Sequence, residues 1–167
     1  MPTTAISPKQ QFLDALTREH ETTYKILRAF PSRQSEFKPH ERSNTARQLA
    51  WTFVAEQGLM MGVVTGTLKI EGGIPPAPDS YDAIVEQYEQ DFRSLVALLE
   101  SVPDSQLEGT TRFVTGPKQM GDVPKMDVLW FALHDQIHHR GQLSVYLRMV
   151  GGKVPSIYGP SADEPWM

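Results

Sequence analysis

The sequence contains no cysteine among its 167 residues. This absence excludes disulfides, a thiolate nucleophile and cysteine-ligated zinc, so any metal site must use nitrogen and oxygen ligands. Long apolar runs are also missing, and none approaches the roughly 18 residues of a membrane span. Met1–Gln10 lacks the apolar core of a signal peptide. We therefore expect a cytoplasmic protein that does not enter a membrane.

Clustered positive charge is absent as well. The 16 Lys and Arg residues are scattered and are outnumbered by 20 Asp and Glu, which gives a formal net charge of −4. A nucleic-acid-binding surface would need a gathered basic stripe, so no nucleic-acid partner is expected. No Gly-rich phosphate loop, nucleophile elbow or dinucleotide fingerprint occurs, and nothing indicates nucleotide use. If the protein is an enzyme, a small-molecule substrate is expected.

The sequence does contain the apolar spacing that is typical of amphipathic helices. Hydrophobic residues make up 40% and charged residues 22%, as in ordinary globular domains, so residues 1–167 are expected to form a single domain. Apolar residues recur at spacings of three and four in four long segments, which predicts an all-α four-helix bundle with long connections. A leader over residues 1–7 precedes the first helix. The expected helices run from Pro8 to Pro31, from Ser43 or Asn44 to about Leu68, from Asp79 or Ser80 to Pro103, and from near Pro124, capped by Asp122, to about Val150.

Two local features depart from plain helix. Thr110–Thr115 is β-prone and is followed by Gly-Pro, which predicts a short strand or β-hairpin before the last helix. Gly58, Gly62 and Gly66 recur every fourth residue in the second helix, although each costs roughly 1 kcal/mol relative to alanine. We interpret them as a face of close helix–helix approach; fraying of the far end of this helix is the alternative.

The histidines point to a metal. Phe131–Met149 holds three of the five histidines. His134 and His138 are four apart, so in a helix they share a face and can bind one ion from a single turn. His139 is turned by about 100° from His138 and is expected to face another helix or a partner. Catalytic zinc-type sites use three protein ligands and one open position, so a third ligand is required.

Glu56 is the expected third ligand. It is the only carboxylate between Glu41 and Glu71, and it lies one turn after Thr52, whose neutral hydroxyl is a poor ligand. Glu56 can alternatively act as a catalytic general base. His20 on the first helix is a second candidate for the third ligand. The predicted metal ligands are therefore His134, His138 and Glu56.

The residues around the histidines also have expected roles. Arg140 is expected to pair with a carboxylate on another helix, or else to bind an anionic substrate. Gln142 is expected to hydrogen-bond a ligand or an imidazole. Gly141, in the middle of a helix, indicates close packing or close access to the site.

These motifs carry a resemblance to a known family. The run HDQIHHRGQLSVYLRMVGGKVPSIYGPSADE, with its HxxxH, RGQ and YLR elements, resembles the C-terminal signature of the DinB-like (DinB/YfiT) superfamily. The second-helix phrase TARQLAWTFVAEQ and the order of the helices also fit, so the resemblance covers most of the chain. It implies an up-down-down-up four-helix bundle that is often dimeric, here a homodimer.

The resemblance also implies a metal held by one histidine from the second helix and two from the fourth. His134 and His138 match the pair, although many relatives place the second ligand directly before RGQ, where this chain has His139. The helical spacing favours His138. Where relatives often read AWH, this chain reads Ala50-Trp51-Thr52. Glu56 or His20 then replaces the missing histidine, or the site is degenerate.

The implied function is that of a divalent-metal-dependent enzyme, with Zn or Ni as the cofactor. Family members with assigned activity include transferases and isomerases that use low-molecular-weight thiols, so transfer of such a thiol is the expected reaction. Metal-dependent hydrolysis is one alternative. A non-catalytic metal-binding or stress-associated dimeric module is another, and a structural dimer without metal is the third.

Overall fold

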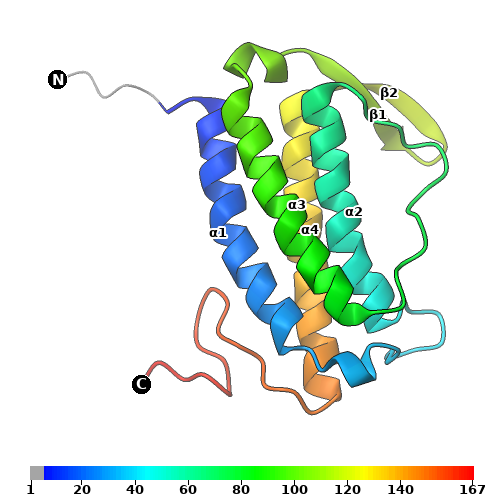
Figure 1. The fold of residues 1–167 in the computed structure, drawn as a ribbon, viewed down its shortest axis with the longest axis vertical. Coiled ribbons are helices and arrows are strands. Elements are labelled where there is room, and N and C mark those ends of the chain that lie inside the picture. The colour runs from blue at the N-terminus through cyan, green and yellow to red at the C-terminus, as the bar shows by residue number, and fades with distance from the viewer. Residues whose placement is uncertain (1–5) are drawn as a thin grey trace.

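The computed structural model describes residues 6–167, so residues 1–5 of the expected leader lie outside the described part. The predicted all-α four-helix bundle is confirmed, with a small two-stranded antiparallel sheet beside it (Figure 1). The long helices are α1 (Pro8–Ala29), α2 (Ala46–Thr65), α3 (Tyr81–Ser101) and α4 (Lys125–Met149); the strands are β1 (Thr110–Gly116) and β2 (Gln119–Pro124).

Local capping sets most of the helix ends. The side chains of Ser7, Thr45 and Ser80 each accept a hydrogen bond from a backbone N–H in the first turn of α1, α2 and α3. The expected cap of α4 was wrong. Asp122 lies within β2, paired with Arg112 of β1, and α4 instead follows Pro124 without a side-chain cap. The sheet register thus carries Asp122 away from the start of the helix.

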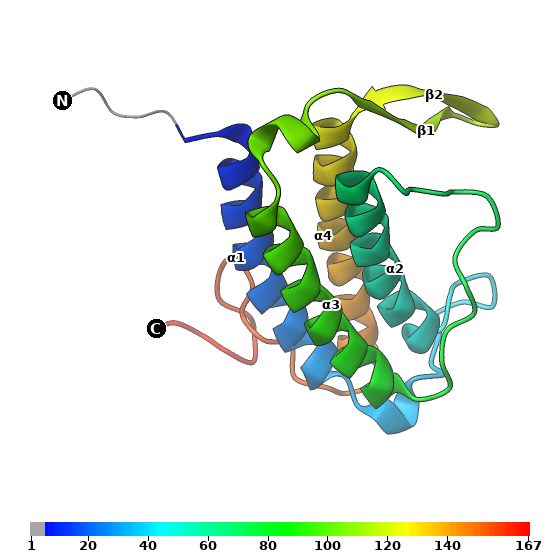
Figure 2. The same cartoon turned by 45° about the horizontal axis from the view of Figure 1, so that its top comes forward.

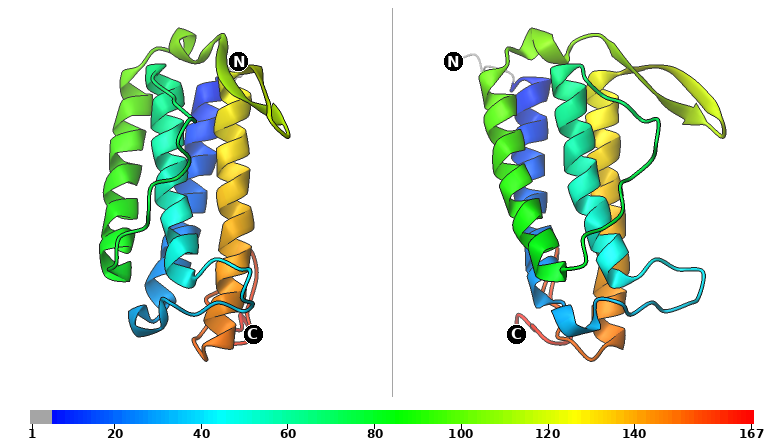
Figure 3. Two further views of the ribbon diagram at one scale, coloured as in Figure 1. Left: turned by 90° about the vertical axis from the view of Figure 1, so that its right-hand side faces the viewer. Right: turned by 45° about the vertical axis from the view of Figure 1, so that its right-hand side comes forward.

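The direction of the chain explains the long connection between α2 and α3. Following the colours of Figure 1, α1 and α4 run one way through the bundle while α2 and α3 run the other way. The parallel neighbours α2 and α3 need a connection that returns along the whole bundle, and the segment 66–80 does this (Figure 3). α2 is about 30 Å long, and 15 extended residues can span about 50 Å. The β1–β2 hairpin projects from the end where α4 begins (Figure 2).

The core is divided into two apolar halves. One half contains Phe12, Leu16, Met60, Leu95 and Leu129, and the other contains Ile26, Phe53, Ile84, Tyr88 and Leu147. Buried polar side chains contributed by α1, α2 and α4 lie near the middle of these helices: His20, Thr23, Glu56, Gln57, Gln136 and Arg140. Because burying polar groups is costly without partners, this polar layer is the place to look for function.

No helix within residues 6–167 combines the length and apolar character that crossing a membrane requires.

The glycines of α2 do not form a helix–helix contact, and that interpretation was wrong. A Cβ at Gly62 would meet the backbone of Leu68 in the following segment, not another helix. Gly66 ends α2 in the left-handed region with φ 74°. A Cβ at Gly58 would meet nothing within 4 Å, and the same holds for Gly141 in α4. The protein itself therefore gives no packing reason for Gly58 or Gly141.

Replacing Gly58 or Gly141 with alanine is expected to raise the free energy of unfolding by up to about 1 kcal/mol each, because both are helical and have room for a methyl group. Gly152→Ala is the contrasting variant, since its Cβ would lie 2.1 Å from a methyl carbon of Leu147. Urea unfolding of the three variants tests this. A loss of stability in Gly58→Ala as large as in Gly152→Ala would contradict it.

Candidate metal centre

Glu56 of the polar layer converges with two less buried side chains, Asp135 and His139, between α2 and α4. Oε1 of Glu56 lies 2.9 Å from Nδ1 of His139, and Oδ2 of Asp135 lies 4.0 Å from the same nitrogen. One ligand atom from each residue lies within 4.8 Å of the other two. Atoms that share one ion at bond lengths near 2.1 Å lie roughly 3 to 3.5 Å apart. Small side-chain movements would therefore let these three groups hold one ion.

The helices fix this arrangement. Asp135 and His139 are four residues apart in α4, so they lie one above the other on one face. That face packs against α2, where Glu56 lies in the middle of the helix. The side-chain exposure rises from 7% at Glu56 to 19% at His139 and 36% at Asp135. The site is thus closed on the side of α2 and open to solvent beside Asp135.

Glu56 is in an unusual state for a carboxyl group. Burial, and then the neighbouring Asp135 carboxylate, raise the pKa of Glu56 from 4.5 to about 10. Its second oxygen, Oε2, is buried and has no hydrogen-bond partner within residues 6–167. A buried polar atom without a partner is uncommon in native proteins. A bound cation would supply the missing partner and stabilise the ionised form, so the residues present fit a metal ion.

The predicted pair on α4 lies elsewhere. His134 and His138 are both exposed, and neither belongs to the cluster around Glu56. Nε2 of His138 lies 2.9 Å from the side-chain nitrogen of Gln142, which confirms that Gln142 hydrogen-bonds an imidazole. The reason is rotation along the helix: His138 precedes His139 by about 100°, and it is His139 that faces α2.

Glu56 is the predicted residue that the structure does bring to the cluster, and Asp135 is the residue that sequence reasoning missed. The available signal was His139, directly before Arg140-Gly141-Gln142. Applied to His139 instead of His138, the four-residue spacing leads to Asp135. Thr52, one turn before Glu56, uses its hydroxyl to donate to the carbonyl of Gln48.

His20, the alternative third ligand, is engaged in a different contact. Its Nε2 lies 2.8 Å from Oε2 of Glu89, and its ring stacks on Phe92 with centroids 3.5 Å apart. Burial lowers the pKa of His20, while Glu89 opposes this shift. His20 is therefore part of the packing between α1 and α3 and does not join Glu56.

Arg140 forms the predicted ion pair with another helix. Its guanidinium, almost fully buried, donates to Oε2 of Glu19 in α1 at 2.7 Å and to the hydroxyl of Thr23 at 3.3 Å. Tyr158 of the C-terminal segment accepts from Arg140 and donates to the same Glu19 oxygen. This network joins α1, α4 and the C-terminal segment through Arg140, the residue that follows His139.

Arg140→Ala is expected to lower the free energy of unfolding by about 3 kcal/mol, because it leaves Glu19 and Thr23 without their buried partner. Tyr158→Phe should cost about 1 kcal/mol, since it removes a single hydroxyl from the network. Thermal and urea unfolding measure both. Equal effects of the two variants would show that the ion pair does not dominate.

Known proteins resemble this chain in sequence and in fold. The family model of the DinB family matches residues 1–166, and the chain therefore belongs to the DinB family. The uncharacterized protein YrdA from Bacillus subtilis (strain 168) is 29% identical over 154 residues, which is 92% of this chain and 89% of that protein.

Solved structures agree with this assignment. A DinB-like protein from Bacillus cereus ATCC 10987 superposes with a TM-score of 0.73 and 25% identity, covering 88% of this chain and 95% of that one. YfiT from Bacillus subtilis, a probable metal-dependent hydrolase with an unusual four-helix-bundle topology, superposes with a TM-score of 0.60 and 13% identity. That superposition covers 92% of this chain and 94% of YfiT, and at this identity it shows the shared fold.

Proposed function

We propose that the protein is a metal-dependent hydrolase that acts on a small molecule, with a divalent ion held by Glu56, Asp135 and His139. The observation that carries the proposal is the unpartnered Oε2 of Glu56, buried beside a second carboxylate and an imidazole. YfiT, which shares the fold, is a probable metal-dependent hydrolase. Hydrolysis replaces thiol transfer as the favoured reaction because two of the three ligands are hard carboxylates, and thiols favour softer sites.

Each residue has a part in this proposal. His139 and Asp135 would hold the ion from one turn of α4, and the carboxylate of Glu56 would hold it from α2. The ion, when bound, would polarise the substrate and lower the pKa of a water molecule. The Glu56 oxygen that does not face the ion would accept a proton from the attacking water, which keeps for Glu56 the catalytic role expected from sequence. The more exposed side at Asp135 is where a substrate would approach.

The chemistry of the three ligands affects which metal ion the site prefers. Imidazole with carboxylates suits Zn²⁺, Fe²⁺ and Mn²⁺, and carboxylates shift the preference towards the harder ions. We therefore propose Zn²⁺ or Mn²⁺ in place of the Zn or Ni expected from sequence. His134 and His138 remain a predicted ligand pair, and the test must include them.

The experiment is an assay of the metal-free protein reloaded with Zn²⁺ or Mn²⁺, using chromogenic carboxylic and phosphate esters. We expect metal-dependent turnover that falls at least about 100-fold in Asp135→Asn. His40→Ala is the matched control, because His40 is an exposed histidine in the α1–α2 connection. Thiol-dependent turnover of an electrophile, without ester hydrolysis, would favour the thiol transferase instead. Metal binding without any turnover would favour a non-catalytic module.

Two narrower expectations stay predictions. The first is a homodimer, for which the exposed Phe131, Val145 and Met149 of α4 offer an apolar surface. Light scattering across a dilution series would test it. The second is a cytoplasmic location.

A further inference from the structure

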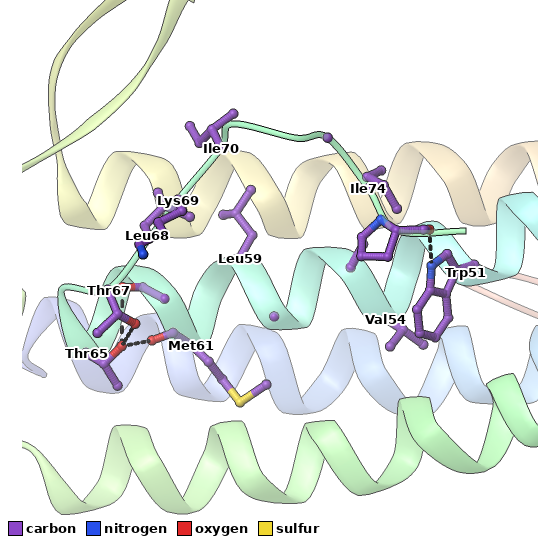
Figure 4. A pocket seen from close by; sticks show the side chains of 15 residues that line it. Trp51, Val54, Leu59, Met61, Thr65, Thr67, Leu68, Lys69, Ile70 and Ile74 are labelled. Carbon is purple, nitrogen blue, oxygen red and sulfur yellow. Dashed lines mark hydrogen bonds between the residues drawn. The ribbon is translucent and has the colours of Figure 1, made fainter. Parts of the chain in front are cut away.

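A groove on the far side of α2 has no assigned role. It lies between α2 and the segment that follows it, and its volume is about 610 Å³ (Figure 4). Small-molecule sites commonly have roughly 300 to 1,000 Å³. Gly58, which lines the groove, is two residues from Glu56 and therefore about 200° around the helix. The groove, here called the α2 groove, is thus separate from the metal centre.

The segment that follows α2 forms the roof of the α2 groove, and hydrogen bonds hold it at both ends. At one end, the backbone N–H groups of Thr67 and Leu68 donate to the carbonyl of Gly62. At the other end, Nε1 of Trp51 donates to the carbonyl of Pro75 at 2.8 Å (Figure 4). The chain between these anchors stands off the helix, so the groove is already formed without a ligand.

Gly58 makes the floor of the groove hollow. A Cβ there would meet no atom within 4 Å, although a helical glycine costs roughly 1 kcal/mol relative to alanine. The walls beside it are apolar and include Leu59, Ile70 and Ile74 (Figure 4). Along the helix the lining runs from Trp51 to Thr65, a distance of about 21 Å. This shape suits an elongated apolar molecule.

The polar side chains of the groove decide the charge of the ligand. Trp51 is bonded to the roof, and the hydroxyls of Thr65 and Thr67 bond each other, with Thr65 also donating to Met61. Lys69 is the one polar side chain of the lining that makes no hydrogen bond or ion pair within residues 6–167. Its ammonium group is available for an anion.

We propose that the α2 groove binds an elongated apolar molecule with one anionic end, of the medium-chain carboxylate class. The apolar chain lies over Gly58 and between Ile70 and Leu59, and the carboxylate lies at Lys69. A peptide is a poorer occupant, because the lining leaves few polar side chains to pair with a peptide backbone. Binding here does not require the metal, so it is tested on protein kept in chelator.

The experiment is a titration of the ¹⁵N-labelled full chain, followed by two-dimensional NMR, with octanoate and with 1-octanol. Octanoate should give saturable shifts at the amides of Gly58, Leu59 and Ile70, with a Kd in the millimolar range or tighter. Gly58→Leu should weaken octanoate at least tenfold by filling the floor. Gly141→Leu is the matched control, since Gly141 is also helical with no atom near its Cβ, and it should bind as wild type.

Lys69→Gln tests the anionic end without altering the floor. It should weaken octanoate about two- to fivefold and leave 1-octanol unchanged, because an exposed charge pair contributes little more than this. Equal loss in Gly58→Leu and Gly141→Leu would overturn the proposal, as would shifts that never saturate. Shifts at the same amides on concentrating the protein alone would also overturn it, by showing that a second copy fills the groove.

Discussion

His139→Ala is expected to weaken binding of a divalent ion at least about 100-fold, because it removes the nitrogen on which both carboxylates converge. Asp135→Ala and Glu56→Ala should weaken binding by at least tenfold each. Isothermal titration of metal-free protein with Zn²⁺ and with Mn²⁺ measures these losses. Circular dichroism of each variant separates lost ligands from lost structure.

The exposed histidines provide the decisive comparison. His134→Ala and His138→Ala should each bind within about threefold of wild type, as should His40→Ala, because neither residue of the pair reaches Glu56. A loss in His138→Ala that exceeds the loss in His139→Ala would contradict the assignment. It would restore the ligand pair that the four-residue spacing of His134 and His138 predicts.

The second large effect is a steep dependence of metal affinity on pH. The pKa of Glu56 is about 10 without metal, so Glu56 is protonated at neutral pH and must lose its proton to become a ligand. The apparent affinity should therefore rise about tenfold per pH unit between pH 6 and 8. Titrations in buffers of different ionisation enthalpy should detect the proton that Glu56 releases. An affinity that is flat over this range would contradict the account.

Glu56 also makes the stability of the metal-free protein depend on pH. Here the trend is opposite, because stability falls as pH rises whereas metal affinity increases. An acid whose pKa is raised by folding holds a proton that the unfolded chain has lost, so the free energy of unfolding falls as pH rises from about 5 to about 10. The slope is up to about 1.4 kcal/mol per pH unit. Glu56→Gln removes this slope and should be more stable than wild type at pH 8. Equal pH slopes in the two proteins would show that Glu56 is not the group responsible.

The fold was largely predictable from sequence because its signals are local. The apolar spacing that defines the helices and the side chains of Ser7 and Ser80 that cap two of them act within a few residues. The β-hairpin was predictable for the same reason, because its β-prone residues and the Gly-Pro of its turn are local signals. Asp122 failed as a cap because pairing with β1, a contact set by strand register, took precedence over local preference.

The candidate metal centre was less predictable because it depends on which face of α4 meets α2. A difference of one residue turns a side chain by about 100°. The four-residue spacing favoured His134 and His138 as a pair of metal ligands. Spacing could not reveal that His139 points at Glu56. The long separation between Glu56 and His139 in the sequence is closed only by packing of α2 against α4. Glu56 could be proposed because it is the only carboxylate on that helix.

The most direct test is a crystal structure of protein purified without chelator, with anomalous scattering recorded above and below the absorption edge of the bound metal. One ion per chain is expected, bonded to Glu56, Asp135 and His139. An ion bonded to His134 and His138 instead, or no ion in protein that has been supplied with Zn²⁺ and Mn²⁺, would contradict this expectation.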